Sequence, residues 1–251
     1  MILSWLLGCA DPPPTEVEPA SSLPTAAEYT AACEERLGPV PALSCEDVPV
    51  VLQQATLADG TVVPLVARTD AVPDGTCDRP SPLSGCVPGS RGGVVENAQG
   101  TRFYLLCRVN RAATPDGWYD DVAMLARDED SGATCMWGAP EDGEIRDGSV
   151  LPVPGSDDDG GFWADPPTLA GIGCRSCHDG NGLVVTPWIA ASLPPADPDG
   201  PLDLLFADVL ATVDPTWAGT PLWVHPDGAP CRTCHALPEG PACAFGPSGR
   251  A

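Results

Sequence analysis

Cysteine content is the feature that most limits how this chain can fold, because twelve cysteines occur in 251 residues. Four of them form two Cys-x-x-Cys pairs, and the other eight are scattered: Cys9, Cys33, Cys45, Cys77, Cys86, Cys107, Cys135 and Cys243. Proteins of the reducing cytosol rarely carry so many thiols, whereas exported chains oxidise them to disulfides. We therefore expect an exported protein with a cross-linked N-terminal domain. Cys33 with Cys45, and Cys77 with Cys86, are close enough in sequence to bridge, although spacing leaves the connectivity open.

Turn residues divide the first part of the chain into short elements, since glycine contributes 27 residues and proline 31. A helix is predicted over residues 25–37, where Thr25 and Glu28 form a capping-box pattern and Gly38 ends the helix. Two extended segments flank Asp59-Gly60, a pair typical of hairpin turns. The segments predicted as strands are residues 48–57 and 62–68, followed by three runs that favour strands or one short helix, residues 93–96, 102–109 and 121–127.

The N-terminus indicates export and anchoring. Residues 1–8 (MILSWLLG) form an apolar run directly before Cys9, and residues 9–24 have the composition of a disordered tether. The run and its cysteine resemble the lipobox of bacterial lipoproteins, which implies a lipidated Cys9 and a membrane anchor. Ala10 follows this cysteine, and a residue other than aspartate at that position resembles the pattern of lipoproteins that are sorted to the outer membrane. The alternative is a cleaved signal peptide and a periplasmic protein.

A histidine directly follows each Cys-x-x-Cys pair, in residues 174–178 (CRSCH) and 231–235 (CRTCH). This spacing suits covalent haem attachment, because two cysteines can form thioethers with the haem vinyl groups while the histidine binds the iron. Both motifs resemble the haem-attachment site of c-type cytochromes. The resemblance implies two covalently bound haem c groups, held by Cys174, Cys177, Cys231 and Cys234, with His178 and His235 as proximal iron ligands.

Zinc binding is the main alternative role for these cysteines. One site with four thiolate ligands would explain two Cys-x-x-Cys pairs, but it would leave both adjacent histidines unexplained. The stretch between the pairs is also longer than in a usual zinc ribbon. A thioredoxin-like redox centre is disfavoured because neither motif has a βαβ context.

The distal haem ligands are less constrained. The methionines lie upstream of both motifs, and Met124 and Met136 are expected in the core of the N-terminal domain. His225 is the third and last histidine of the chain, and it is either a distal iron ligand or a histidine in a surface loop. Three histidines cannot fill four axial positions, so one iron is expected to have a weak or absent distal ligand.

The formal net charge of −23 argues against nucleic-acid binding, which needs clustered basic residues. It also argues against electrostatic docking on anionic lipid, while it could steer a basic partner.

In the second half, residues 202–213 place apolar side chains at helical spacing, which predicts a helix. Four tryptophans of this half, Trp163, Trp188, Trp217 and Trp223, favour core packing over an electron route.

The sequence therefore predicts an α+β protein with a strand-rich, disulfide-containing N-terminal domain and a loop-rich, partly helical cytochrome c-like region. The expected parts are an export signal with lipobox (1–8), a tether (9–24), the cysteine-containing domain (25–150), a linker (151–161) and the dihaem region (162–251). The expected function is electron transfer near a bacterial membrane with an unidentified redox partner protein. A dihaem peroxidase and a zinc-stapled, non-redox surface lipoprotein are the alternatives.

Overall fold

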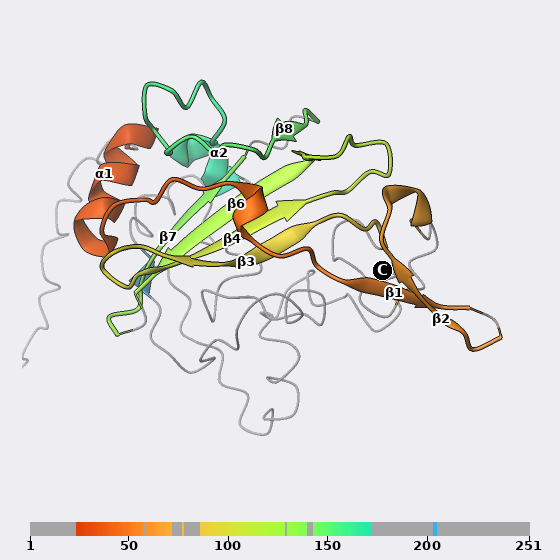
Figure 1. Ribbon diagram of the computed structural model, residues 1–251. Helices are drawn as coiled ribbons and strands as arrows, with labels where there is room; N and C mark the ends of the chain where they lie inside the picture. The colour runs from red at the N-terminus through yellow and green to blue at the C-terminus, as the bar shows by residue number, and fades with distance from the viewer. Residues whose placement is uncertain are drawn as a thin grey trace, which may run out of the picture.

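The computed structural model describes residues 24–57, 59–71, 77, 86–128, 130–139, 143–171 and 203–204. Within these ranges the fold is strand-rich with few helices (Figure 1). The helices are α1 (Ala26–Leu37), α2 (Pro166–Gly171) and two short 3-10 helices, η1 (Cys45–Asp47) and η2 (Arg68–Asp70). The strands are β1 (Gln53–Thr56), β2 (Val62–Leu65), β3 (Arg91–Glu96), β4 (Arg102–Arg108), β5 (Trp118–Tyr119), β6 (Asp121–Arg127), β7 (Ala133–Gly138), β8 (Arg146–Asp147) and β9 (Asp203–Leu204).

Helix α1 begins where its capping box predicts. The backbone N–H of Glu28 donates to the Thr25 hydroxyl at 3.2 Å, and the Thr25 N–H donates to the Glu28 carboxylate at 2.8 Å. These two bonds satisfy donors that the first helical turn leaves without a partner. Gly38 ends the helix with a φ of 76°, a left-handed value that favours glycine.

A five-stranded sheet in the order β3-β4-β6-β7-β9 forms the centre of the fold. Its first four strands are antiparallel neighbours, and β9 pairs with β7 in parallel. The strands predicted from the apolar runs are confirmed as β3, β4 and β6. Strand β7 was not predicted, since all six of its residues are buried and its sequence shows no apolar–polar alternation.

The predicted helix over residues 202–213 is wrong at its start. Asp203 and Leu204 are the two residues of β9, which pair with Ala133 and Thr134. The backbone groups at the outer edge of β7 bind a strand there, and this long-range pairing overrides the local helical spacing. The rest of that predicted helix lies outside the described residues.

A two-stranded hairpin of β1 and β2 extends from the side of the sheet that carries β3 (Figure 1). The predicted turn at Asp59-Gly60 is confirmed: Gly60 has a φ of 85°, and the Asp59 carboxylate accepts a hydrogen bond from the Thr61 N–H at 2.9 Å. Val50 forms an isolated bridge with Arg91 and so connects the chain before β1 to the main sheet.

Helix α1 packs on β7 and fixes one side of the core. The Tyr29 hydroxyl accepts from the Met136 N–H at 3.0 Å and donates to its carbonyl at 3.1 Å. The Trp137 indole N–H donates to the Thr30 hydroxyl at 3.1 Å, and the Tyr29 and Trp137 rings meet edge to face. Met136 and Met124 are both buried, as predicted.

Three disulfides cross-link the described residues. Cys33–Cys135 joins α1 to β7, and Cys45–Cys107 joins η1 to β4. The predicted Cys77–Cys86 bridge is confirmed beneath the hairpin, whereas the suggested pairing of Cys33 with Cys45 is wrong. The reason is that α1 and η1 pack on different strands of the sheet, so each cysteine meets a distant partner.

Residues 151–171 pack against this same core. Leu151, at the start of the expected linker, is buried and forms a bridge with Leu43. Trp163 belongs to the core, where its indole N–H donates to the Pro152 carbonyl at 2.7 Å. Leu169 of α2 is buried as well, so the packed body extends beyond residue 161.

The sequence separations of the disulfides predict different losses of stability. Cys33–Cys135 spans 102 residues and Cys77–Cys86 only 9. The chain-entropy relation assigns about 5 kcal/mol to a loop of the first size and about 2.5 kcal/mol to one of the second. We expect the variant with Cys33→Ala and Cys135→Ala to lose roughly twice the free energy of unfolding lost by the variant with Cys77→Ala and Cys86→Ala. Urea unfolding of the oxidised proteins measures both, and equal losses would contradict the expectation.

Candidate functional site

The residues predicted to bind haem, iron and lipid lie outside the described residues. They are Cys174, Cys177, His178, Cys231, Cys234, His235, His225 and Cys9. Their roles therefore stay predictions. In the described ranges no cluster of three or more histidine, cysteine or carboxylate side chains is suited to hold a metal ion. No described helix has the length and hydrophobicity needed to cross a membrane.

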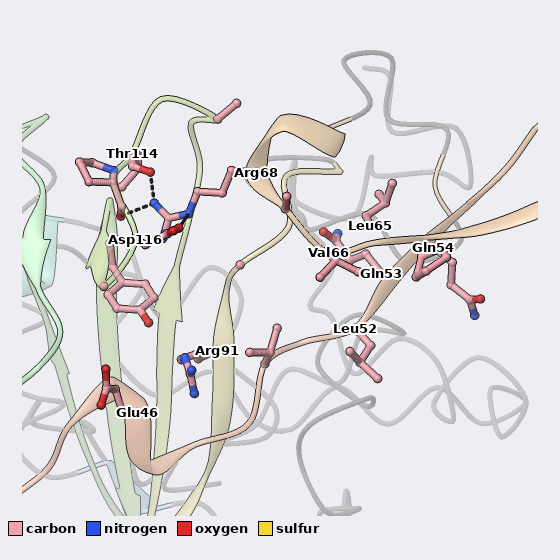
Figure 2. Close-up of a pocket in the computed structure, with 18 residues that line it drawn as sticks. Glu46, Leu52, Gln53, Gln54, Leu65, Val66, Arg68, Arg91, Thr114 and Asp116 are labelled. Carbon is pink, nitrogen blue, oxygen red and sulfur yellow. Dashed lines mark hydrogen bonds and ion pairs between the residues drawn. The ribbon is translucent and has the colours of Figure 1, made fainter.

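The candidate site that the structure does describe is a cleft of about 1140 Å³ between the β1–β2 hairpin and the start of the main sheet (Figure 2). Apolar side chains of the hairpin region form one wall, among them Leu52 and Val66. Arg68, Arg91 and Asp116 supply the charged side chains of the opposite wall, together with Glu46. The cleft thus has an apolar end and a polar end.

Arg68 holds the two walls in place. Its guanidinium donates hydrogen bonds to the carbonyl oxygens of Thr114 and Pro115, and to that of Trp118 at 3.2 Å. Arg68 also forms an ion pair with the exposed Asp116 at 3.4 Å. Because Arg68 directly follows the hairpin, these bonds fasten the hairpin to the loop before β5.

The backbone before the hairpin is fixed as well. The Val51 N–H donates to the Ser90 carbonyl at 2.8 Å, and the Gly92 N–H donates to the Pro49 carbonyl at 3.0 Å. After the hairpin, the Asp70 carboxylate accepts from the Ala67 N–H at 2.9 Å. The cleft is therefore a preformed feature of the fold, bounded by hydrogen-bonded backbone on both sides.

Tyr119 lies at the polar end and is buried. Burial raises the pKa of Tyr119 above its ordinary value of 10.0, although the charges of Arg91 and Arg68 oppose this shift. The phenol is neutral at physiological pH and can both donate and accept hydrogen bonds. Arg91 itself donates to the Val48 carbonyl at 2.9 Å.

The hydroxyl and carboxylate side chains of the lining are those of Thr114, Tyr119, Glu46 and Asp116. Among the described residues that border the cleft there is no serine, cysteine or histidine, and these are the side chains that most often act as nucleophile and base. The arginines are engaged with backbone carbonyls and a carboxylate. Binding of an apolar surface is what this arrangement supports.

Asp120 shapes the loop that forms the polar wall. Its carboxylate accepts hydrogen bonds from the Thr114 hydroxyl at 2.8 Å, from the Asn110 N–H at 2.7 Å and from the Arg111 guanidinium at 2.6 Å. Burial alone would raise its pKa, but these hydrogen bonds outweigh that effect and keep the pKa of Asp120 below its ordinary value of 3.8. Asp120 is therefore an ionised anchor of the loop.

No continuous sequence motif marks the cleft. Its residues come from five separate stretches that only the long-range pairing of the sheet brings together. One local signal was present: residues 62–66 place valine or proline at 62, 64 and 66, on the face opposite the buried Leu65. Apolar residues on both faces of one hairpin indicate that each face packs against another surface.

Comparison of the chain with protein-family models, with curated proteins and with solved structures finds no match.

The hydrogen bonds to Asp120 predict a pH-dependent loss of stability. Because its pKa is lowered in the folded state, the ionised carboxylate stabilises the fold above its ordinary pKa of 3.8, and this contribution is lost as the pH falls through the folded-state value. We expect Asp120→Asn to lower the free energy of unfolding by about 2 kcal/mol at pH 7. The difference from the parent protein should shrink below pH 3.8.

Urea unfolding at pH 7 and in more acidic buffer measures this difference, with the exposed Asp158→Asn as the control. A difference that stayed constant over the whole pH range would show that the Asp120 charge contributes nothing.

Proposed function

We propose that this chain is an exported dihaem c-type cytochrome that transfers electrons near a bacterial membrane. Its C-terminal part is a loop-rich, partly helical cytochrome c-like region. Cys174 and Cys177 hold one haem, and Cys231 and Cys234 hold the other, through thioether bonds. His178 and His235 are the proximal ligands, and haem iron supplies one-electron redox chemistry when bound.

The placement of the histidines carries the proposal. The chain has three histidines, and two of them directly follow the only two Cys-x-x-Cys pairs. Chance rarely produces this arrangement, and the donor set is the one that covalent haem attachment needs: two thiols for the vinyl groups and an adjacent imidazole for iron. A zinc site would use the thiols and leave the histidines without a role.

The disulfides support an oxidising location. Six of the scattered cysteines pair with one another in the described residues, so none of them is available to the motif cysteines. Multiple disulfides are consistent with an exported, non-cytosolic protein. We place the protein in the periplasm or, through a lipid on Cys9, on the outer membrane.

The proposed partner is a redox protein of opposite charge. With a formal net charge of −23, the chain attracts basic proteins over long range and accelerates their encounter at low salt.

A second function, peroxidase activity, follows from the histidine count. His178, His235 and His225 fill at most three of the four axial positions on two irons. The remaining position would be open to peroxide unless a methionine or a partner supplies a ligand. Peroxide turnover by the haem-loaded protein separates this enzyme from the electron carrier.

A haem-stained denaturing gel tests the proposal. The full chain, produced in a bacterium that attaches haem to exported proteins, should keep its stain after denaturation, because thioethers survive where axial bonds do not. The variant with Cys174→Ala and Cys177→Ala, and that with Cys231→Ala and Cys234→Ala, should each retain half of the stain per chain. The variant with Cys77→Ala and Cys86→Ala is the control and should retain all of it. An unstained parent protein that contains zinc would overturn the proposal.

A further inference from the structure

The β1–β2 hairpin carries most of the exposed large apolar side chains of the described residues. Five of these seven side chains lie in or beside the hairpin: Val50, Leu52, Leu57, Val62 and Val66. Leu52 is 68% exposed and Val66 is 75% exposed. The other two, Trp118 and Val150, lie elsewhere in the fold.

Strand geometry shows that four of these side chains, those of Val50, Leu52, Val62 and Val66, lie on one face. Gln53 and Ala55 of β1 point inward with Leu65 of β2, and all three are buried. Side chains alternate along a strand, so the even-numbered positions point outward. We call these outward positions the outer hairpin face: Val50, Leu52, Gln54, Thr56, Val62, Pro64 and Val66.

The outer hairpin face has no charged side chain, although the chain as a whole is strongly acidic. A hairpin that meets water on one side normally places polar residues there. Contiguous exposed apolar surface marks a region that another surface covers. Five residues of the face also line the cleft, so face and cleft form one continuous surface: Val50, Leu52, Gln54, Pro64 and Val66 (Figure 2).

The C-terminal segment, residues 205–251, has the composition that such a surface would bind. It holds four acidic and two basic residues, a net charge of −2, whereas the preceding 204 residues carry the other −21. Its first twenty residues include apolar side chains at short intervals: Leu205, Phe206, Val209, Leu210, Val213, Trp217, Leu222, Trp223 and Val224.

The segment is also within reach. It begins directly after β9, which is part of the main sheet. An extended chain spans about 3.3 Å per residue, so fifteen residues can cover about 50 Å. A domain of this size has a diameter of roughly 40 Å. A tethered segment meets the surface at millimolar effective concentration, an advantage that no separate molecule has.

A second copy of the chain fits the surface less well. Each copy carries a net charge of −23, so two copies repel one another as they approach. A basic partner protein would gain from the overall charge, but the outer hairpin face offers it no carboxylate.

We propose that residues 205–251 dock on the outer hairpin face and the adjoining cleft. The motif at residues 231–235 is thereby held against the N-terminal domain, whose apolar wall shields whatever group the motif binds. Arg91, Tyr119 and Glu46 at the polar end of the cleft provide hydrogen-bonding partners for polar groups of the segment. The inference requires no haem, so it stands or falls separately from the proposed function.

Site-directed photo-cross-linking in the full chain tests the docking. A benzophenone side chain is placed at Leu52, at Val66 or, as the control, at Val150, which is 74% exposed and lies outside the hairpin. Purified protein is irradiated, and the products are mapped by mass spectrometry. We expect intramolecular cross-links from positions 52 and 66 to residues 205–251, and none from position 150. Cross-linked dimers, cross-links to another protein, or no cross-link to residues 205–251 would overturn the proposal.

A second measurement, limited proteolysis, tests the same docking in variants of the outer hairpin face. The variant with Leu52→Asp and Val66→Asp should expose residues 205–251 to a non-specific protease and raise the cleavage rate in this segment about tenfold. Val150→Asp should leave the rate unchanged. An unchanged midpoint of urea unfolding in the variants shows that the core is retained. Equal cleavage rates in the parent protein and the double variant would contradict the docking.

Discussion

The disulfide between Cys33 and Cys135 joins α1, near the start of the described chain, to β7, which lies 102 residues later. A second disulfide, between Cys45 and Cys107, joins η1 to β4 across 62 residues. These links remove much of the conformational freedom of the unfolded chain, which matters in a sequence rich in glycine and proline. Helix α1 is also anchored by hydrogen bonds that Tyr29 and Thr30 form with β7, and by the Asn97 amide, which donates to the Leu37 carbonyl.

The hairpin and its cleft depend on this cross-linked body. Cys45 holds η1 on the sheet, and the chain then runs from η1 through the Val50–Arg91 bridge into β1. Directly after the hairpin, at its base, Arg68 fastens the chain to the loop that Asp120 supports. An apolar face is thus presented on a rigid base. Docking of residues 205–251 on that face would give the N-terminal domain a purpose as the apolar wall of the second Cys-x-x-Cys-His motif.

Local patterns located two local elements, whereas the helical spacing of residues 202–213 predicted the wrong structure at its start. The capping box of α1 and the Asp59-Gly60 turn are determined by a few neighbouring residues, so the sequence alone located both. Strand β7, the pairing of β9 with β7 and the partner of Cys33 depend on contacts between distant segments, which no local pattern encodes. The cleft was missed for the same reason. The two Cys-x-x-Cys-His motifs are different again, since the haem attachment proposed for them depends on five adjacent residues and can be proposed without reference to the fold.

Top-down mass spectrometry of the purified, exported protein tests the central claim most directly, because one spectrum assigns every cysteine. The account predicts one haem on residues 174–177, one haem on residues 231–234, and disulfides joining Cys33 to Cys135, Cys45 to Cys107 and Cys77 to Cys86. Motif cysteines found as free thiols, as zinc ligands or in disulfides with the N-terminal cysteines would contradict it.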